Sequence, residues 1–189
     1  HWVHSKLMAW LALERGLALH SKSGSKGKLE RWRTEREAIA RDLLANGWNE
    51  GRRTYTRSYG SSDVDAAILS PELFAFEQDP SRLEGTVEAI RDELTAGGPL
   101  LYRYLRPAGE EEGAFLPCSF WLVQALVRLG RVGEAASVFE EACGLANDVG
   151  LLPEEIDPTS GDFLGNFPLA FTHATLVNAA LDLQGANQK

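Results

Sequence analysis

The sequence predicts an all-α protein built from an array of αα-hairpins. Segments that are apolar on nearly every face alternate with segments that carry a single apolar stripe, and short links join the two kinds. The apolar segments begin near Val3, Asp63, Phe115 and Phe167, at intervals of 60, 52 and 52 residues. A repeat of this length is typical of stacked helical hairpins. The sequence shows no β pattern of comparable length, so we expect an inner layer of buried helices and an outer layer of amphipathic helices.

The first repeat covers the N-terminal quarter of the chain. Residues 2–19 are rich in helix formers and mostly apolar, so we expect a largely buried helix. Residues 29–46 place one apolar stripe among Arg and Glu side chains, which predicts an amphipathic helix that Asn46-Gly47 ends. The polar, glycine-broken residues 21–28 connect the two.

The second repeat has a shorter inner helix. Asp63 is expected to cap an apolar helix that runs through Leu69 and breaks at Ser70-Pro71, and Asp65 is a second candidate for the cap. Residues 81–96 carry apolar side chains at helical spacing and predict an amphipathic helix, which the glycines that follow would end.

The third repeat and the start of a fourth complete the chain. Residues 114–129 are apolar nearly all round and predict a buried helix, whereas residues 131–147 predict an amphipathic one. A loop over residues 150–165 then leads into a last apolar helix, expected from residue 167 to residue 181.

The loops before the inner helices favour one arrangement of these repeats. An open superhelix usually has short, similar loops, whereas these loops are long, dissimilar and dense in Trp, Tyr, Arg, Glu and Asp. We therefore expect a closed ring with a pocket at one end of the inner helices. Only about seven helices can be counted, so a closed ring would need further chain before His1. The sequence also begins with His and not with Met. The 189 residues are expected to form one portion of a single domain.

Composition narrows the class of partner and the compartment. The 19 basic and 27 acidic residues give a net charge of −8, and the one basic block spans residues 22–36, so no nucleic-acid partner is expected. No apolar run is long enough to cross a membrane, and nothing near His1 resembles a signal peptide. Cys118 and Cys143 lie in apolar helical patterns and are expected to be buried free thiols, which favours a cytoplasmic protein.

The acidic loop over residues 150–165 is the strongest candidate site. Glu154 and Glu155 are adjacent there, and a glycine-broken segment carries the chain on into the last apolar helix. Burial at the mouth of such a helix raises the proton affinity of a carboxylate, while the loop keeps it open to substrate. The pattern is therefore typical of a catalytic carboxylate, although a solvated acidic loop or helix-capping carboxylates would produce it too.

Five blocks of the sequence, in this order, resemble the glucoamylase-like inverting enzymes of glycoside hydrolase family 15. That family also contains glucodextranases and some bacterial trehalases. The blocks are HWVHSKLMAW (1–10), GWNEGRRTYTRSYGSSDVDAAIL (47–69), LLYRYLRPAGEEEGAFLPCSFWLVQAL (100–126), ANDVGLLPEEIDPTSG (146–161) and LGNFPLAFTHATLVNAAL (164–181). The resemblance implies an (α/α)6 toroid, of which residues 1–189 would form roughly half, the C-terminal part of a catalytic domain.

The resemblance also implies a catalytic role for Glu154. It matches the family's general base, which activates the attacking water, and the adjacent Glu155 is the competing candidate. Inverting glycosidases use two carboxylates that stand about 6.5–9.5 Å apart. The family's general acid is a glutamate just upstream of the block matched by residues 1–10, so we expect it before His1. This chain alone should then be inactive, and it should associate with the missing half or with itself through exposed apolar flanks.

Further residues are implied to contact an oligosaccharide substrate. Arg103 would grip sugar hydroxyls with its planar guanidinium, and Phe171 would pack on the apolar face of a sugar ring. Their alternatives are an arginine stacked on Tyr102 or Tyr104, and plain core packing. Four other candidates lie in or beside the loops of the expected rim: Glu155, Glu112, Trp48 and Glu50.

The sequence therefore predicts an inverting, exo-acting hydrolase of α-linked gluco-oligosaccharides. The alternatives are a trehalose hydrolase of the same family, a non-catalytic helical-hairpin module that binds a protein or glycan, and another (α/α)6 enzyme, which would not explain the ordered motifs. Single histidines on inner helices, such as His4 and His173, are usually satisfied core residues. We expect neither a metal site nor a cofactor.

Overall fold

Helices dominate the computed structural model, which describes residues 1–23, 29–106, 112–186 and 188. Over these residues the chain forms seven α-helices and one 3-10 helix, which confirms the predicted all-α array. They are α1 (Val3–Ser23), α2 (Leu29–Asn46), η1 (Ala66–Leu69), α3 (Pro71–Phe76), α4 (Pro80–Leu94), α5 (Leu116–Arg128), α6 (Val132–Cys143) and α7 (Ala170–Ala186).

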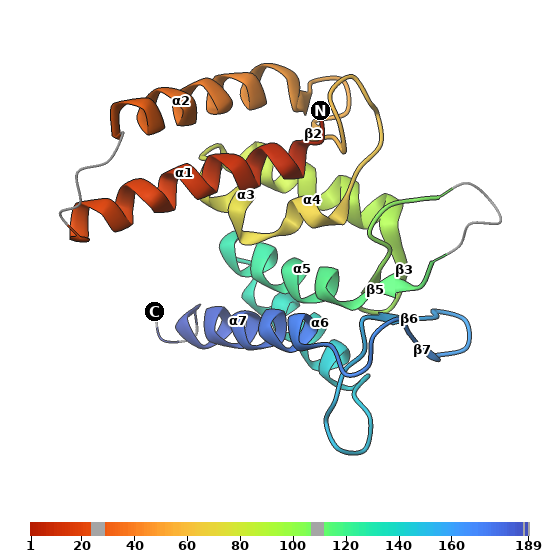
Figure 1. Cartoon of the computed structure of the whole chain (residues 1–189). Helices are drawn as coiled ribbons and strands as arrows, with labels where there is room; N and C mark the ends of the chain where they lie inside the picture. The colour runs from red at the N-terminus through yellow and green to blue at the C-terminus, as the bar shows by residue number, and fades with distance from the viewer. Residues whose placement is uncertain (24–28, 107–111, 187, 189) are drawn as a thin grey trace.

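The helices stack as successive hairpins, from α1 and α2 at one end to α5, α6 and α7 at the other (Figure 1). Helix α5 lies at the centre of the stack, because it packs against α6, α7, η1 and α3. Its residues from Leu116 to Leu126 are all buried. Helix α4 buries a single stripe that includes Val87, Ile90 and Leu94, as expected of an outer, amphipathic helix.

Short antiparallel strands join the helices along one side of the stack (Figure 1). They are β1 (Trp48–Asn49), β2 (Thr54–Tyr55), β3 (Thr95–Gly97), β4 (Leu100–Leu101), β5 (Ala114–Phe115), β6 (Glu155–Ile156) and β7 (Phe163–Leu164). Strands β1 and β2 pair, β3 and β4 pair, and β5, β6 and β7 form a three-stranded sheet in that order. The loops that precede the inner helices therefore meet on the same rim, and this rim carries the candidate site.

Two helices that were expected to be buried are not. Among the described side chains of α1, only Val3 and Leu7 are buried, and Met8 is exposed. In α7, Val177 and Leu181 are exposed. The main packing partners are α2, α3 and η1 for α1, and α5 and α6 for α7, and they leave part of the surface of each helix uncovered. Within this part of the chain, the apolar sequences of α1 and α7 therefore wrongly predicted that these helices are buried.

The second repeat also differs from its prediction. The expected helix from Asp63 to Leu69 is the four-residue 3-10 helix η1, and its N-cap is Asp65, whose side chain accepts from the backbone N–H of Ala67. Pro71 does not end the helical region, because it occupies the first turn of α3, where a missing N–H costs nothing.

Several helix ends differ from the predicted ends by a few residues. Strand β3 takes the end predicted for the 81–96 helix, and β5 takes the start predicted for the 114–129 helix. Helix α6 ends at Cys143, where the glycine that follows serves as C-cap. Helix α7 begins only at Ala170, because Phe167 precedes Pro168 and a residue before proline disfavours the helical conformation.

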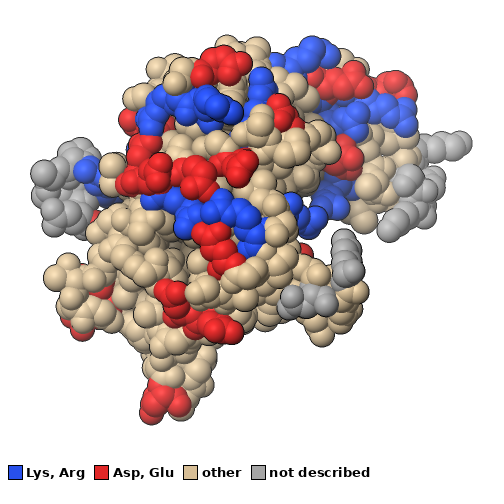
Figure 2. All heavy atoms as spheres, turned by 180° about the vertical axis from the view of Figure 1, so that it is seen from behind, with Lys and Arg blue, Asp and Glu red and all other residues tan. Residues whose placement is uncertain are grey.

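Acidic and basic side chains lie next to one another on the upper part of the face shown in Figure 2. Arg91 pairs with Glu134, and Arg131 pairs with Glu88, so ion pairs link α4 to the α6 region. In the described part of the chain, no helix combines the length and apolarity that a membrane crossing requires. Both cysteines are free, with Cys118 buried as predicted and Cys143 only partly so.

Candidate active site

Glu154 lies directly before β6, in the segment between α6 and α7. Its backbone N–H donates to the carbonyl oxygen of Asn166 at 2.9 Å, and its own carbonyl accepts from the N–H of Leu116 at 3.0 Å. Its carboxylate atom Oε2 accepts two further hydrogen bonds from Asn166, from the backbone N–H at 2.9 Å and from Nδ2 at 2.6 Å. Both of these donors bind Oε2, so the geometry presents Oε1 as the oxygen that could accept a proton from water.

Gly165 makes this close approach possible. A Cβ added there would lie 2.8 Å from Oε2 of Glu154, which is closer than real Cβ atoms come, and 3.1 Å from its Cβ, which is tighter than most real contacts. The backbone φ of +71° is also one that residues with side chains rarely adopt. Neither Gly165 nor Asn166 was predicted as a site residue, although the Gly-Asn pair lies in the fifth matched block.

Glu155 is held on a different strand interface. It belongs to β6, between β5 and β7, and its Oε2 accepts from the backbone N–H of Gly113 at 3.2 Å. Glu154 lies just outside this strand, and the two carboxylates have different hydrogen-bond partners. Burial, followed by the nearby carboxylate of Glu112, raises the pKa of Glu155.

Arg103 follows β4 and is tied to the start of η1. Its carbonyl accepts from the N–H of Ala66 at 2.7 Å, and its Nε lies 3.6 Å from Oδ1 of Asp65. The side chain remains 44% exposed. The ring of Tyr104 lies 5.9 Å from the guanidinium carbon, at the outer limit of a cation–π contact. The arrangement therefore leaves the guanidinium free to reach a ligand.

Two cavities adjoin Arg103. One, of about 230 Å³, is also lined by Trp2, His4, Arg57 and Tyr104. The other, of about 220 Å³, contains Glu112 in its wall together with Arg103 and Tyr104. Glu112 forms an ion pair there with Arg106. Arg103 and Tyr104 thus connect the start of α1 with the β5 edge that contacts Glu155.

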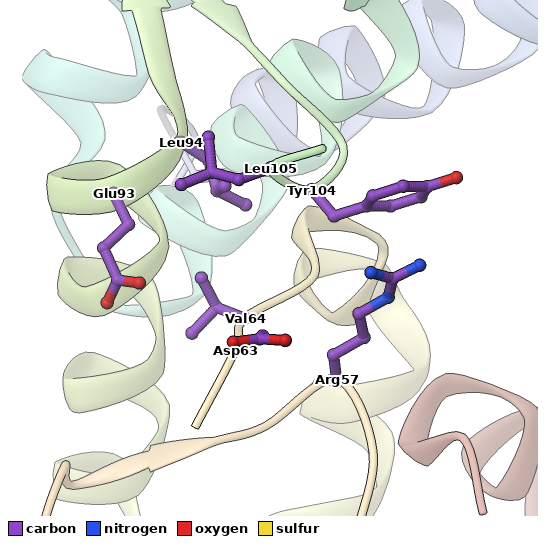
Figure 3. A pocket seen from close by; sticks show the side chains of 7 residues that line it. All are labelled: Arg57, Asp63, Val64, Glu93, Leu94, Tyr104 and Leu105. Atoms are coloured by element: carbon purple, nitrogen blue, oxygen red, sulfur yellow. The ribbon is translucent and has the colours of Figure 1, made fainter. Parts of the chain in front are cut away.

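Arg57 is a lining residue that sequence analysis did not select. Its guanidinium carbon lies 4.9 Å from the ring of Trp2 and 3.8 Å from the ring of Tyr104. Figure 3 shows it beside Tyr104 in a third cavity, of about 370 Å³, whose wall includes Asp63 and Glu93. Its only signal in the sequence is its place in the aromatic, charged loop of the second block.

The structure places Trp48 and Glu50 elsewhere. The indole Nε1 of Trp48 donates to Glu50 at 2.6 Å, and the guanidinium of Arg82 lies 4.9 Å from the ring. Neither residue lines the cavities around Arg103. Within the described structure these two candidates form their own contact against α4.

Phe171 lies in an aromatic group at the start of α7. Its ring is 5.8 Å from Trp121 and 6.5 Å from Phe115, yet the residue is 49% exposed. The ring packs on core aromatics, as the core interpretation expects, and it also presents surface to solvent, which contact with a sugar would require.

The two histidines differ. Nε2 of His173 accepts from the N–H of Leu152 at 3.1 Å, as expected of a satisfied interior histidine. His4 lines the cavity beside Arg103, and burial lowers its pKa although Asp65 acts in the opposite direction. Over the described residues, no three His, Cys, Asp or Glu side chains are grouped as metal ligands would be.

Comparisons with known proteins agree on one family. Residues 1–181 match the family described as Glycosyl hydrolases family 15. A trehalase of Mycobacterium tuberculosis is 40% identical over 194 positions, which cover 100% of this chain and 28% of that protein. A trehalase of Thermoplasma volcanium is 33% identical over 188 positions, covering 98% of this chain and 30% of the relative. This chain therefore spans less than a third of the length of these two relatives.

Solved structures share the fold at low identity. The glycoside hydrolase family 15 glucoamylase from Hypocrea jecorina superimposes with a TM-score of 0.74 and 13% identity, over 98% of this chain and 42% of that one. A bacterial glucoamylase in complex with acarbose gives a TM-score of 0.75 at 16% identity, over 97% of this chain and 34% of that one. The helical-hairpin array is thus roughly half of an (α/α)6 toroid.

Proposed function

The chain belongs to glycosyl hydrolase family 15, and we propose that the protein containing it hydrolyses an α-glucoside, with trehalose as the first candidate substrate. The observation that carries this choice is the 40% identity to a trehalase across the whole chain. The glucoamylases support only the fold, because their identities are 13% and 16%. The relatives therefore favour trehalose over the malto- and isomalto-oligosaccharides that the sequence suggested first.

Glu154 is the proposed general base. Asn166 fixes one carboxylate oxygen with two donors, which orients the other toward a water molecule. That water, once deprotonated, would attack the anomeric carbon from the face opposite the leaving group and invert its configuration. Glu155 would then be a neighbour that shapes the site and not the base, since its carboxylate accepts from the N–H of Gly113, directly before β5.

The proposed general acid lies outside this chain. An inverting glycosidase needs a second carboxyl group that protonates the leaving oxygen, and the resemblance locates it upstream of residue 1. This chain spans 28% of the M. tuberculosis trehalase, so most of the corresponding protein lies outside it. We accordingly propose that residues 1–189 alone do not turn over substrate.

Arg103 and Phe171 are the proposed sugar contacts. The guanidinium can donate to two hydroxyls at once, and the exposed part of the Phe171 ring can pack on a sugar ring. Glu112 lies in the second cavity next to Arg103 and can accept from a hydroxyl group. For Trp48 and Glu50 the case is weaker, because they contact α4 and not these cavities.

The exposed apolar side chains of α1 and α7 are proposed to pack against the rest of the protein. Met8 on α1, with Val177 and Leu181 on α7, would otherwise present apolar surface to water. Expressed alone, residues 1–189 should therefore self-associate. Coexpression with the remaining part of the parent protein should suppress this, and light scattering can measure both states.

The proposed function is tested with the full-length protein. We would follow glucose release from trehalose, maltose and isomaltose by NMR at early times. Inverting hydrolysis of α,α-trehalose yields one β-glucose from the attacked sugar and one α-glucose from the leaving sugar, whereas a retaining enzyme yields α-glucose alone. Trehalose should give the highest kcat/KM and the inverted product. Binding without glucose release would instead support the non-catalytic module.

A further inference from the structure

Asp65 has two partners of different kinds. As the N-cap of η1 it accepts from the N–H of Ala67 at 2.9 Å, and the same oxygen lies 3.6 Å from Nε of Arg103. The residue is only 6% exposed. A buried carboxylate is costly unless a positive group compensates its charge, and Arg103 is the cation beside it. The cap therefore does not account for the whole environment of Asp65.

A second link fixes the backbone of Arg103. The N–H of Ala66 donates to its carbonyl oxygen at 2.7 Å, so the start of η1 holds the backbone of Arg103, while Asp65 forms an ion pair with the Nε edge of its side chain. A guanidinium is planar, and occupation of its Nε edge sets the direction of its two terminal nitrogens. The cavity of about 230 Å³ adjoins this group.

We propose that Asp65 is a positioning residue: it orients the Arg103 guanidinium so that both terminal nitrogens can donate to hydroxyls of the reacting sugar. The inference rests on the proposed function, because it requires Arg103 to contact the sugar. A cap alone needs only an oxygen acceptor, which Asn or Ser supplies as well as Asp. The role of the negative charge at this position is therefore to orient the Arg103 guanidinium.

Neighbouring groups respond to both members of the pair. At His4 and at Cys118, burial has the largest effect on the pKa, Asp65 raises the pKa and Arg103 lowers it. The carboxylate and the guanidinium thus have effects of opposite sign on the pKa values of the same two side chains. This agrees with a charge pair set between the start of α1 and the first turn of α5.

A double-mutant cycle in the full-length protein tests the inference. The variants are Asp65→Asn, which keeps an oxygen for the Ala67 N–H, Arg103→Gln, and the two combined. Asp65→Asn should lower kcat/KM for trehalose about 10-fold or more, yet change it by less than about 2-fold when Arg103 is already Gln. A merely structural role would lower the rate equally in both backgrounds and would also lower Tm.

Asp79→Asn is the matched control. Asp79 caps α4 by accepting from the N–H of Ser81 at 2.9 Å, the same distance as in η1, and no Arg103 contact is involved. Its replacement should leave kcat/KM within about 2-fold. If Arg103→Gln is too slow to assay, calorimetric affinity for trehalose in a Glu154→Gln background can complete the cycle.

The outcomes separate this inference from the proposed function. An Asp65→Asn effect that is absent, or that is equal with and without the Arg103 guanidinium, overturns the positioning role while wild-type hydrolysis leaves the function intact. A full-length wild type that releases glucose from none of the three disaccharides overturns the function and the positioning role together.

Discussion

Glu154 and Glu155 are adjacent at the start of β6, but their carboxylates have different partners. Asn166 holds the Glu154 carboxylate by one oxygen in a loop. The Glu155 carboxylate accepts from the N–H of Gly113, directly before β5, and burial and Glu112 raise its pKa. Residue type and spacing cannot distinguish these carboxylates, but their partners can. A general base needs a fixed direction, and the two Asn166 donors give the Glu154 carboxylate one.

Replacing each glutamate by Gln should give the largest difference in kcat between the two positions. Glu154→Gln in the full-length protein removes the proton acceptor, and kcat should fall by about 10²–10⁴-fold. Glu155→Gln keeps an oxygen for the Gly113 N–H and should lower kcat by less than about 10-fold. Initial rates on trehalose measure both, and the reverse order would assign the base to Glu155.

Gly165→Ala should have the next largest effect, through the position of Glu154. The new Cβ would displace the Glu154 carboxylate from Asn166, since it would lie 2.8 Å from Oε2. A misplacement of about 1 Å can cost up to 10²-fold in rate, so we expect kcat to fall by about 10-fold or more.

Gly161→Ala is the control for backbone strain. Gly161 has a similar φ of +78°, but a Cβ there would meet no atom within 4 Å. Both alanine variants should therefore lose stability through backbone strain, read as Tm, and Gly165→Ala should lose more because of its contact with Glu154; only Gly165→Ala should lose kcat. Equal loss of kcat in the two would show that strain in the loop, and not contact with Glu154, controls the rate.

The pH dependence of stability should give the smallest difference, measured as the Tm of Glu155→Gln relative to wild type. Because the folded protein raises the pKa of Glu155, the folded state binds more protons at this group than the unfolded state. Its contribution to stability is therefore lost as pH rises through the folded pKa. Glu155→Gln lacks this loss, so its Tm relative to wild type should be higher at pH 7 than at pH 4. A difference in Tm that does not change with pH would contradict the raised pKa.

The order and type of most helices could be predicted because they depend on local pattern, although α3 was not predicted and η1 was expected to be a longer helix. Periodic apolar residues predicted α2, α4 and α6 as amphipathic helices and α5 as a buried one. The burial of α1 and α7 could not be predicted in the same way. Helix α7 is about as apolar as α5 and α1 is less so, but burial depends on neighbours on every side, and part of the surface of each of these two helices is uncovered in this part of the chain.

The candidate site shows a similar division. Glu154, Arg103 and Glu112 could be selected as candidates because their motifs are continuous in sequence. The pairs Asp65–Arg103 and Glu154–Asn166 could not, since they join segments 38 and 12 residues apart through the fold. Trp48 was selected for its aromatic character, which serves equally well for the contact that it makes with Arg82.

Azide rescue tests the role of Glu154 most directly. Azide is a nucleophile that needs no deprotonation, so in the full-length Glu154→Ala variant it can attack the anomeric carbon in place of water. We expect azide to restore turnover of trehalose in Glu154→Ala, with β-glucosyl azide and α-glucose as products, and to leave Glu155→Ala unchanged. Rescue of Glu155→Ala alone, or a product of α configuration, would contradict the assignment of Glu154 as the general base of an inverting enzyme.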